Sequence, residues 1–202
     1  MTDALPMSFL FILPLVAFLY ASVGHGGASG YLALMALFEV APETMKPVAL
    51  LLNILVSLIS FILFFDRTVF PGKLFIALTL ASIPLSYLGG GMQLQQTVYK
   101  LILGIILLIP TVRLLMKRSE DQATRPFTWI PALLMGAGIG ILSGLIGIGG
   151  GIILSPLLLM LRWTSIRQTA AISALFIFVN SISGLAGNEK ALSLLQYNQD
   201  SV

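Results

Sequence analysis

Residues 22–31 read Ser22-Val23-Gly24-His25-Gly26-Gly27-Ala28-Ser29-Gly30-Tyr31, a glycine-rich stretch at the end of the first long apolar segment. A similar run, Gly147-Ile148-Gly149-Gly150-Gly151, returns 123 positions after Gly24, and both runs lie in strongly apolar surroundings. Glycine within a helix costs about 1 kcal/mol relative to alanine, so two such runs need a physical reason. We interpret them as two broken helices, one in each of two related halves of the chain.

The composition is that of a protein that lies largely in lipid. Of the 202 residues, 57% are hydrophobic and only 9% are charged, and the mean hydropathy is +1.00. That leaves too little polar surface to cover a soluble globule. Helices cross a bilayer with roughly 17–25 apolar residues. Five segments reach that length and a sixth is shorter: residues 6–23, 47–65, 98–116, 127–146 and 169–187, and residues 74–88. The sequence therefore predicts an all-α membrane protein, a polytopic helical bundle.

The net charge of +3 does not indicate nucleic-acid binding. The basic residues are scattered over the ends of the predicted helices, without a basic face or an aromatic platform. The chain contains no cysteine, which excludes disulfides and thiolate metal sites. It also lacks the common metalloprotease and nucleotide-binding motifs. We therefore expect no nucleic acid, metal or cofactor, and the lipid bilayer as the surrounding partner.

Each glycine run is followed by a short apolar stretch, residues 31–38 and 152–161, and then by a long helix with a central asparagine. Asn53 and Asn180 are 127 positions apart, which differs from the spacing of the glycine runs by about one helical turn. The second half stops earlier than the first. The expected domains are a first transmembrane repeat, a cytoplasmic loop, an incomplete second repeat and a polar tail: residues 1–116, 117–126, 127–187 and 188–202.

The number of membrane crossings decides how the halves are related. If each short segment completes a crossing with its glycine arm, the first half crosses five times and the second half is inverted. Arg125, Arg162 and Arg167 then share the cytoplasmic side with most other basic residues. If the short segments are re-entrant instead, Arg162 and Arg167 move outside, away from Arg125. The positive-inside rule favours the inverted arrangement, and re-entrant hairpins are the alternative.

Interrupted helices at matching positions of two halves indicate a transporter binding site near the membrane midplane. Unwound backbone persists in a membrane only where it is buried in protein or faces a water-filled cavity. The amides that open each short helix carry the positive end of a helix dipole, and no Asp or Glu lies deep within a predicted span, so the site suits an anion. Its expected residues are Gly24, His25, Gly26, Gly27, Ser29, Asn53, Gly147, Gly149, Gly150, Gly151 and Asn180.

These residues also have a purely structural interpretation. Glycines allow close helix packing, as the four-residue spacing of Gly136, Gly140 and Gly144 indicates, and asparagines can bond between helices. His25, the single histidine, could bind substrate and couple transport to protons, or it could hydrogen-bond to a neighbouring helix. A catalytic interpretation rests only on Gly27-Ala28-Ser29-Gly30, which resembles the GxSG of rhomboid proteases. The later histidine that such a dyad needs is missing, so we do not expect an enzyme.

In three places the chain resembles the TauE/SafE family of sulfite and organosulfonate exporters. They are the glycine motif after the first helix, the segment Gly144-Leu145-Ile146-Gly147-Ile148-Gly149-Gly150-Gly151 with Pro156 behind it, and the helix Ala174-Leu175-Phe176-Ile177-Phe178-Val179-Asn180-Ser181. The resemblance covers roughly residues 6–187. It implies a multi-pass inner-membrane permease that exports a small sulfur-containing anion, sulfite or an organosulfonate.

Two functions stay open at this point. The leading one is a secondary transporter that works by alternating access around the two glycine breaks. Two features depart from the family pattern: His25 has an aliphatic counterpart in Ile148, and the chain ends before the helices that normally complete a family member. The alternative is therefore a truncated membrane protein without independent transport, stable only with a partner or as a homodimer.

Overall fold

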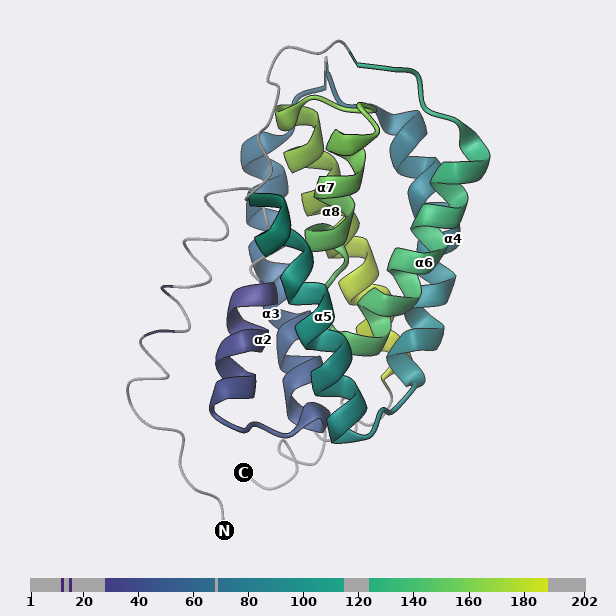
Figure 1. Cartoon of the computed structure of the whole chain (residues 1–202). Coiled ribbons are helices and arrows are strands. Elements are labelled where there is room, and N and C mark those ends of the chain that lie inside the picture. The colour runs from purple at the N-terminus through teal and green to yellow at the C-terminus, as the bar shows by residue number, and fades with distance from the viewer. Residues whose placement is uncertain (1–11, 13–14, 16–27, 68, 115–123, 189–202) are drawn as a thin grey trace, which may run out of the picture.

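The computed structural model describes residues 12, 15, 28–67, 69–114 and 124–188. Within these ranges the chain forms seven α-helices (Figure 1), which confirms the expected all-α fold. Their bounds are α2 Ala28–Leu37, α3 Pro42–Phe64, α4 Gly72–Gly91, α5 Gln96–Leu114, α6 Trp129–Ile146, α7 Gly151–Met160 and α8 Ile166–Gly187.

Four of these helices, α3, α4, α6 and α8, are long and apolar enough to cross a membrane. Their outer faces carry exposed aliphatic side chains, such as Leu55 and Ile59 on α3 and Leu80 on α4, which suit contact with lipid. Helices α2 and α7 have only 10 residues each. At 1.5 Å per residue each spans about 15 Å, half the hydrocarbon thickness. The protein is thus a multi-pass membrane protein with two half-length helices.

The bounds of α3 and α4 differ from those that the sequence predicts in an informative way. Helix α3 begins at Pro42 rather than at residue 47, and Pro47 lies inside it. Proline suits a first helical turn, and Pro42 takes that place. Helix α4 does not end at Leu88 but continues through residues 89–91, which are all glycine, and Pro84 lies inside it. Those glycines permit close packing against neighbouring helices instead of ending the helix.

Helices α4, α6 and α8 pack most closely. On α6, Gly136 faces the backbone of Leu78 and Gly144 faces that of Ser86, both on α4. Because the residue numbers increase in the same direction along both helices, α4 and α6 are parallel. A Cβ on any of the three ladder glycines of α6 would overlap the α4 backbone, which is the packing role that their spacing predicts. Helix α4 also contacts α8, where the Ser86 hydroxyl donates to the Asn180 carbonyl oxygen at 2.8 Å.

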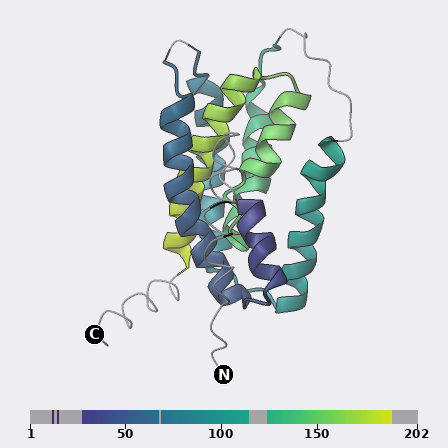
Figure 2. The same ribbon diagram turned by 90° about the vertical axis from the view of Figure 1, so that its left-hand side faces the viewer.

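The two short helices lie at opposite ends of the bundle. In Figure 1, α2 occupies the lower half and joins α3 at the bottom, whereas α7 occupies the upper half and joins α8 at the top. Figure 2 shows the same arrangement from a second side. Both helices therefore begin near the middle of the bundle and run outward in opposite directions. This geometry suits two broken helices whose amino ends meet at the midplane, while the inverted-repeat relation itself stays a prediction.

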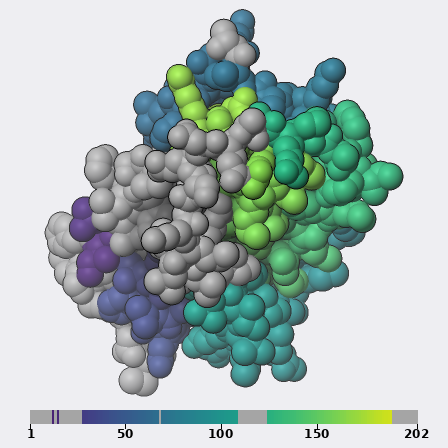
Figure 3. Space-filling view, turned by 45° about the horizontal axis from the view of Figure 1, so that its top comes forward, coloured from purple at the N-terminus to yellow at the C-terminus, as the bar shows by residue number. Residues whose placement is uncertain are grey.

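Arg125, Arg162 and Arg167 lie at one end of the bundle, which we call the arginine end. The amide of Arg125 donates to the carbonyl oxygen of Arg162 at 2.7 Å, and Arg167 pairs with Asp66 at 3.4 Å. Figure 3 brings this end forward and shows the blue α3–α4 connection beside the light green α7–α8 connection. The inverted arrangement requires Arg125 and Arg162 to share a side, whereas re-entrant hairpins would separate them.

Candidate functional site

The break between α6 and α7 is built on glycines with a left-handed backbone. Gly147, which caps the end of α6, has φ +88°, Gly149 has φ +70°, and Gly150, which precedes α7, has φ +82°. Other residues adopt this region at a cost of roughly 1–2 kcal/mol. These glycines let the chain turn back within residues 147–150, so that α7 starts inside the bundle.

Neighbouring side chains leave no room for a larger residue at the break. A Cβ added to Gly149 would lie 2.6 Å from Cγ2 of Ile177, 3.0 Å from Nδ2 of Asn53 and 3.1 Å from Oγ of Ser181. A Cβ added to Gly150 would lie 2.7 Å from Cγ2 of Ile139. Gly149 is thus enclosed by α3 from the first half of the chain and by α8 from the second.

Two carbonyl groups at the break already have side-chain donors. The hydroxyl of Tyr99 on α5 donates to the Ile146 carbonyl oxygen at 2.7 Å, and Nδ2 of Asn53 donates to the Gly147 carbonyl oxygen at 3.0 Å. Both donor side chains are buried. The negative end of the α6 dipole is therefore occupied by fixed protein groups and offers little to a cation.

In contrast to these carbonyl groups, the first amides of α7 have no hydrogen-bond partner among the described residues. The first amides of α7 that donate backbone hydrogen bonds are those of Ile153 and Leu154, both to the Gly150 carbonyl oxygen, at 3.2 and 3.0 Å. In the described part of the chain the preceding amides, those of Gly151 and Ile152, donate no backbone hydrogen bond, and no side chain caps the helix. Open amides at the positive end of a helix dipole form a site that favours an anion.

Buried polar side chains near this helix start lack partners. Among the described residues, Oγ of Ser57 and Oγ of Ser181 are buried and make no hydrogen bond. Ser181 borders Gly149, and Ser57 lies about one helical turn beyond Asn53 on α3. A buried hydroxyl without a partner costs about 1–3 kcal/mol. An oxyanion that accepts hydrogen bonds from Ser57 and Ser181 would remove this cost.

Asn53 links the two short helices. Its side chain is fully buried at the centre of α3. Tyr31, on α2, donates a hydrogen bond from its hydroxyl to Oδ1 of Asn53, while Nδ2 of Asn53 binds Gly147. The Asn53 amide group thus bridges α2 and the α6–α7 break.

The structure brings the predicted second-motif glycines and Asn53 together, but it does not place Asn180 with them. Nδ2 of Asn180 donates to the Phe176 carbonyl oxygen of its own helix at 2.9 Å. In the described chain no hydrogen bond joins Asn180 to the break. Of the first motif, Ser29 is buried in the first turn of α2. The other predicted residues of that motif lie outside the described residues: Gly24, His25, Gly26 and Gly27.

Sequence reasoning missed three hydroxyl groups at the site, those of Tyr31, Tyr99 and Ser181. Tyr31 ends the first glycine stretch, and Ser181 follows Asn180 directly. A search for donors beside the glycine and asparagine positions could have found these two. Tyr99 lies on α5, far from either motif in sequence, and no pattern connects it to Ile146.

Lys46 also has a role that its position in the sequence does not reveal. It is the one buried charged side chain in the described part of the chain, with 6% of its surface exposed. Its ammonium group donates to the carbonyl oxygens of Gly89, Gly90 and Met92 at 3.2, 2.5 and 2.9 Å. Lys46 therefore caps the carboxyl end of α4, where a cation meets the negative end of the helix dipole.

Comparisons with known proteins place the chain among membrane transporters. The family described as "Sulfite exporter TauE/SafE" matches residues 9–199. A protein of Sinorhizobium fredii named "Probable membrane transporter protein" is 37% identical over 199 residues, which cover 92% of this chain and 76% of that protein. A protein of the same description from Methanocaldococcus jannaschii is 32% identical over 117 residues, covering 56% of this chain and 43% of that protein. No solved structure matches the chain.

The family match covers both glycine motifs and every described helix. The described helices are those of a multi-pass membrane protein, and an inner-membrane location is consistent with them. The chain therefore belongs to the sulfite exporter TauE/SafE family and is a membrane transporter.

Proposed function

We propose that the protein is a secondary transporter that exports a small oxyanion, sulfite or an organosulfonate, and that the start of α7 forms part of its binding site. The observation that carries this proposal is the contrast at the α6–α7 break. The Ile146 and Gly147 carbonyls are occupied by Tyr99 and Asn53, whereas the first α7 amides are open. A broken helix offers carbonyls to cations and amides to anions, and here the amides are the free groups.

The remaining site residues come from the predicted repeat. In this proposal the halves at residues 1–116 and 127–187 are inverted copies joined by residues 117–126. The first half contributes Gly24, Gly26, Gly27 and Ser29 to the binding site, and the second half contributes Gly149, Gly150 and Gly151. Asn180 then acts at the first glycine motif as Asn53 acts at the second. The buried Oδ1 of Asn180, which has no hydrogen-bond partner among the described residues, supports this role. His25 links anion movement to protons.

Anion flux tests this function. The purified full chain is reconstituted in proteoliposomes, and uptake is measured for sulfite, an organosulfonate, sulfate, a carboxylate and sodium ions. Sulfite or the organosulfonate should move, and sodium should neither move nor be required. Protein that remains folded by thermal melting and moves none of the anions would contradict the proposal, as would flux of sodium alone.

A further inference from the structure

Helices α3 and α8 form one antiparallel contact that joins the site to the arginine end. Leu50 on α3 lies beside Gly184 on α8, and Asn53 and Ser181 meet at Gly149. At the far end of the same pair, Asp66 contacts Arg167. Residue numbers rise on α3 as they fall on α8, so the contact is continuous between these points. We call it the α3–α8 seam.

The part of the seam between the site and the arginine end is polar inside. Asn53, Ser57 and Ser60 share one face of α3, at spacings of four and three residues, and all three are fully buried. Ser173 is fully buried on the facing helix. The opposite face of α3 carries exposed Leu55 and Ile59. Buried polar groups in transmembrane helices either bond between helices or line a substrate pathway.

Hydroxyl groups continue from the start of α7 into this seam. Ser155 on α7 donates to the Gly151 carbonyl oxygen at 2.9 Å and lies 2.8 Å from Oγ of Ser173 on α8. Oγ of Ser57 on the α3 side is fully buried and makes no hydrogen bond among the described residues. Water or an oxyanion that passes along the seam would provide a partner.

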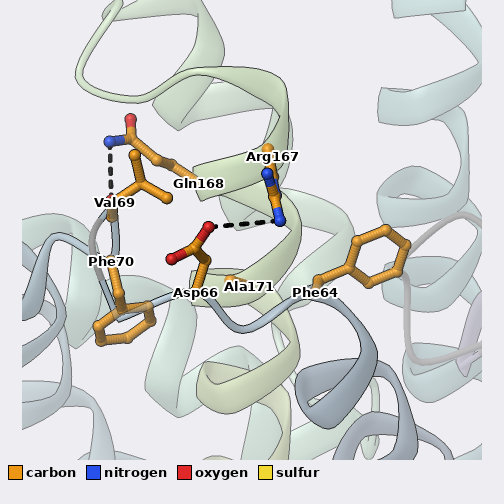
Figure 4. Close-up of a pocket in the computed structure, with 7 residues that line it drawn as sticks. All are labelled: Phe64, Asp66, Val69, Phe70, Arg167, Gln168 and Ala171. Carbon is orange, nitrogen blue, oxygen red and sulfur yellow. Dashed lines mark hydrogen bonds and ion pairs between the residues drawn. The ribbon is translucent and has the colours of Figure 1, made fainter.

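The seam ends at a small hollow closed by two polar contacts (Figure 4). Arg167 pairs with Asp66 at 3.4 Å, and Nε2 of Gln168 donates to the Val69 carbonyl oxygen at 2.9 Å. The side chains of Arg167 and Asp66 are 67% and 29% exposed, so solvent screens the pair and it opens easily. Once released from Asp66, the Arg167 guanidinium would present a positive charge to an anion at this mouth.

We propose that the α3–α8 seam is the route by which the transported anion moves between the α7 site and the arginine end, and that the Asp66–Arg167 pair closes this route. The proposal rests on the proposed function and adds a path and a gate to it. Ser57, Ser60 and Ser173 line the path, and Arg167 receives the anion at the mouth.

Cysteine labelling tests the route without interference, because the native chain contains no cysteine. Ser57→Cys, Ser60→Cys and Ser173→Cys are reconstituted in proteoliposomes and treated with a negatively charged methanethiosulfonate that does not cross membranes. Ile59→Cys on the lipid face of α3 is the matched control. Thr128→Cys reports labelling at the arginine end, because Thr128 is exposed there and its side chain makes no capping bond.

The seam cysteines should react when the reagent is added on the side of the membrane from which it also labels Thr128→Cys. Because the thiolate is the reactive form and a thiol facing lipid stays protonated, they should react at least about tenfold faster than Ile59→Cys. An organosulfonate, which does not react with the methanethiosulfonate as sulfite would, should slow the labelling. Asp66→Asn, which removes one charge of the closing pair, should speed it by about two- to fivefold.

Labelling of all three seam cysteines at the rate of Ile59→Cys, with Asp66 intact and with Asp66→Asn, would overturn the route. Using three seam positions keeps the test valid when one variant folds poorly. Sulfite flux is measured on the same variants before labelling. Intact flux with an unreactive seam refutes the route alone, whereas absent flux in the native chain refutes the proposed function.

Discussion

Replacing Gly149 by alanine perturbs the α6–α7 break at a crowded point with a left-handed backbone. The backbone there has φ +70°, which costs alanine roughly 1–2 kcal/mol. The new Cβ would lie 2.6 Å from Cγ2 of Ile177, so helix α8 or the break must shift. Overpacking of this kind costs about 1–3 kcal/mol, which gives a total of roughly 2–5 kcal/mol.

The matched control is Gly138→Ala on α6, because a Cβ on Gly138 meets nothing within 4 Å. A helical glycine replaced by alanine without a clash gains about 0.5–1 kcal/mol. Thermal melting in detergent should therefore show Gly149→Ala lowered by roughly 4–20 °C and Gly138→Ala unchanged or slightly raised. Sulfite flux should fall only in Gly149→Ala. Equal melting temperatures and equal flux for the two variants would refute the role given to the left-handed glycines.

Three further changes test other contacts. Tyr99→Phe leaves the buried Ile146 carbonyl oxygen without its donor and should lower stability by about 1–3 kcal/mol, measured by thermal melting; an unchanged melting temperature would contradict that bond. Lys46→Met removes the cap of α4 and should lower the melting temperature more than Lys46→Gln, which keeps two donors; the reverse order would argue against capping. His25→Ala should abolish the pH dependence of alkanesulfonate flux between about pH 5 and 8, a range in which this substrate does not titrate, and an unchanged profile would exclude a proton-linked role.

The second helix break could be predicted from sequence because its chemistry is local. Gly147, Gly149 and Gly150 each have a left-handed backbone, and glycine is the residue that adopts it without strain. A cluster of glycines in an apolar setting therefore indicated both the position of the break and the short helix behind it. The lengths of the apolar segments likewise predicted the long helices, since bilayer thickness sets that length.

The glycines at the end of α4 show where such local reasoning fails. A run of three glycines predicts a helix end, yet α4 continues through it to Gly91. A Cβ on Gly89 would lie 2.9 Å from the Leu145 backbone nitrogen of α6. The glycines are thus needed for contact with helices far away in sequence. Propensity could not reveal this, because the tertiary packing decides the outcome.

The polar partners of the site depended on tertiary structure in the same way. Asn53 was predicted from its central place in a long apolar helix, where a polar group needs a reason. Its two partners, Tyr31 and Gly147, lie 22 and 94 positions away along the chain. Tyr99 reaches Ile146 from a helix without any motif. The sequence therefore indicated which segments form the site but not which hydroxyl groups complete it.

The most direct test of an anion site at the start of α7 is sulfite counterflow in proteoliposomes, compared between the native chain and Asn53→Asp. The carboxylate has the shape of the amide and can still accept from Tyr31, but it loses the donor to the Gly147 carbonyl oxygen and places a negative charge beside Gly149. Two like charges about 5 Å apart repel by about 3 kcal/mol at an effective dielectric constant of about 20, which corresponds to more than about 100-fold in affinity. We expect sulfite exchange by the native chain and its loss in Asn53→Asp that still melts as a folded protein. Equal sulfite exchange by both proteins would contradict an anion site at this helix start.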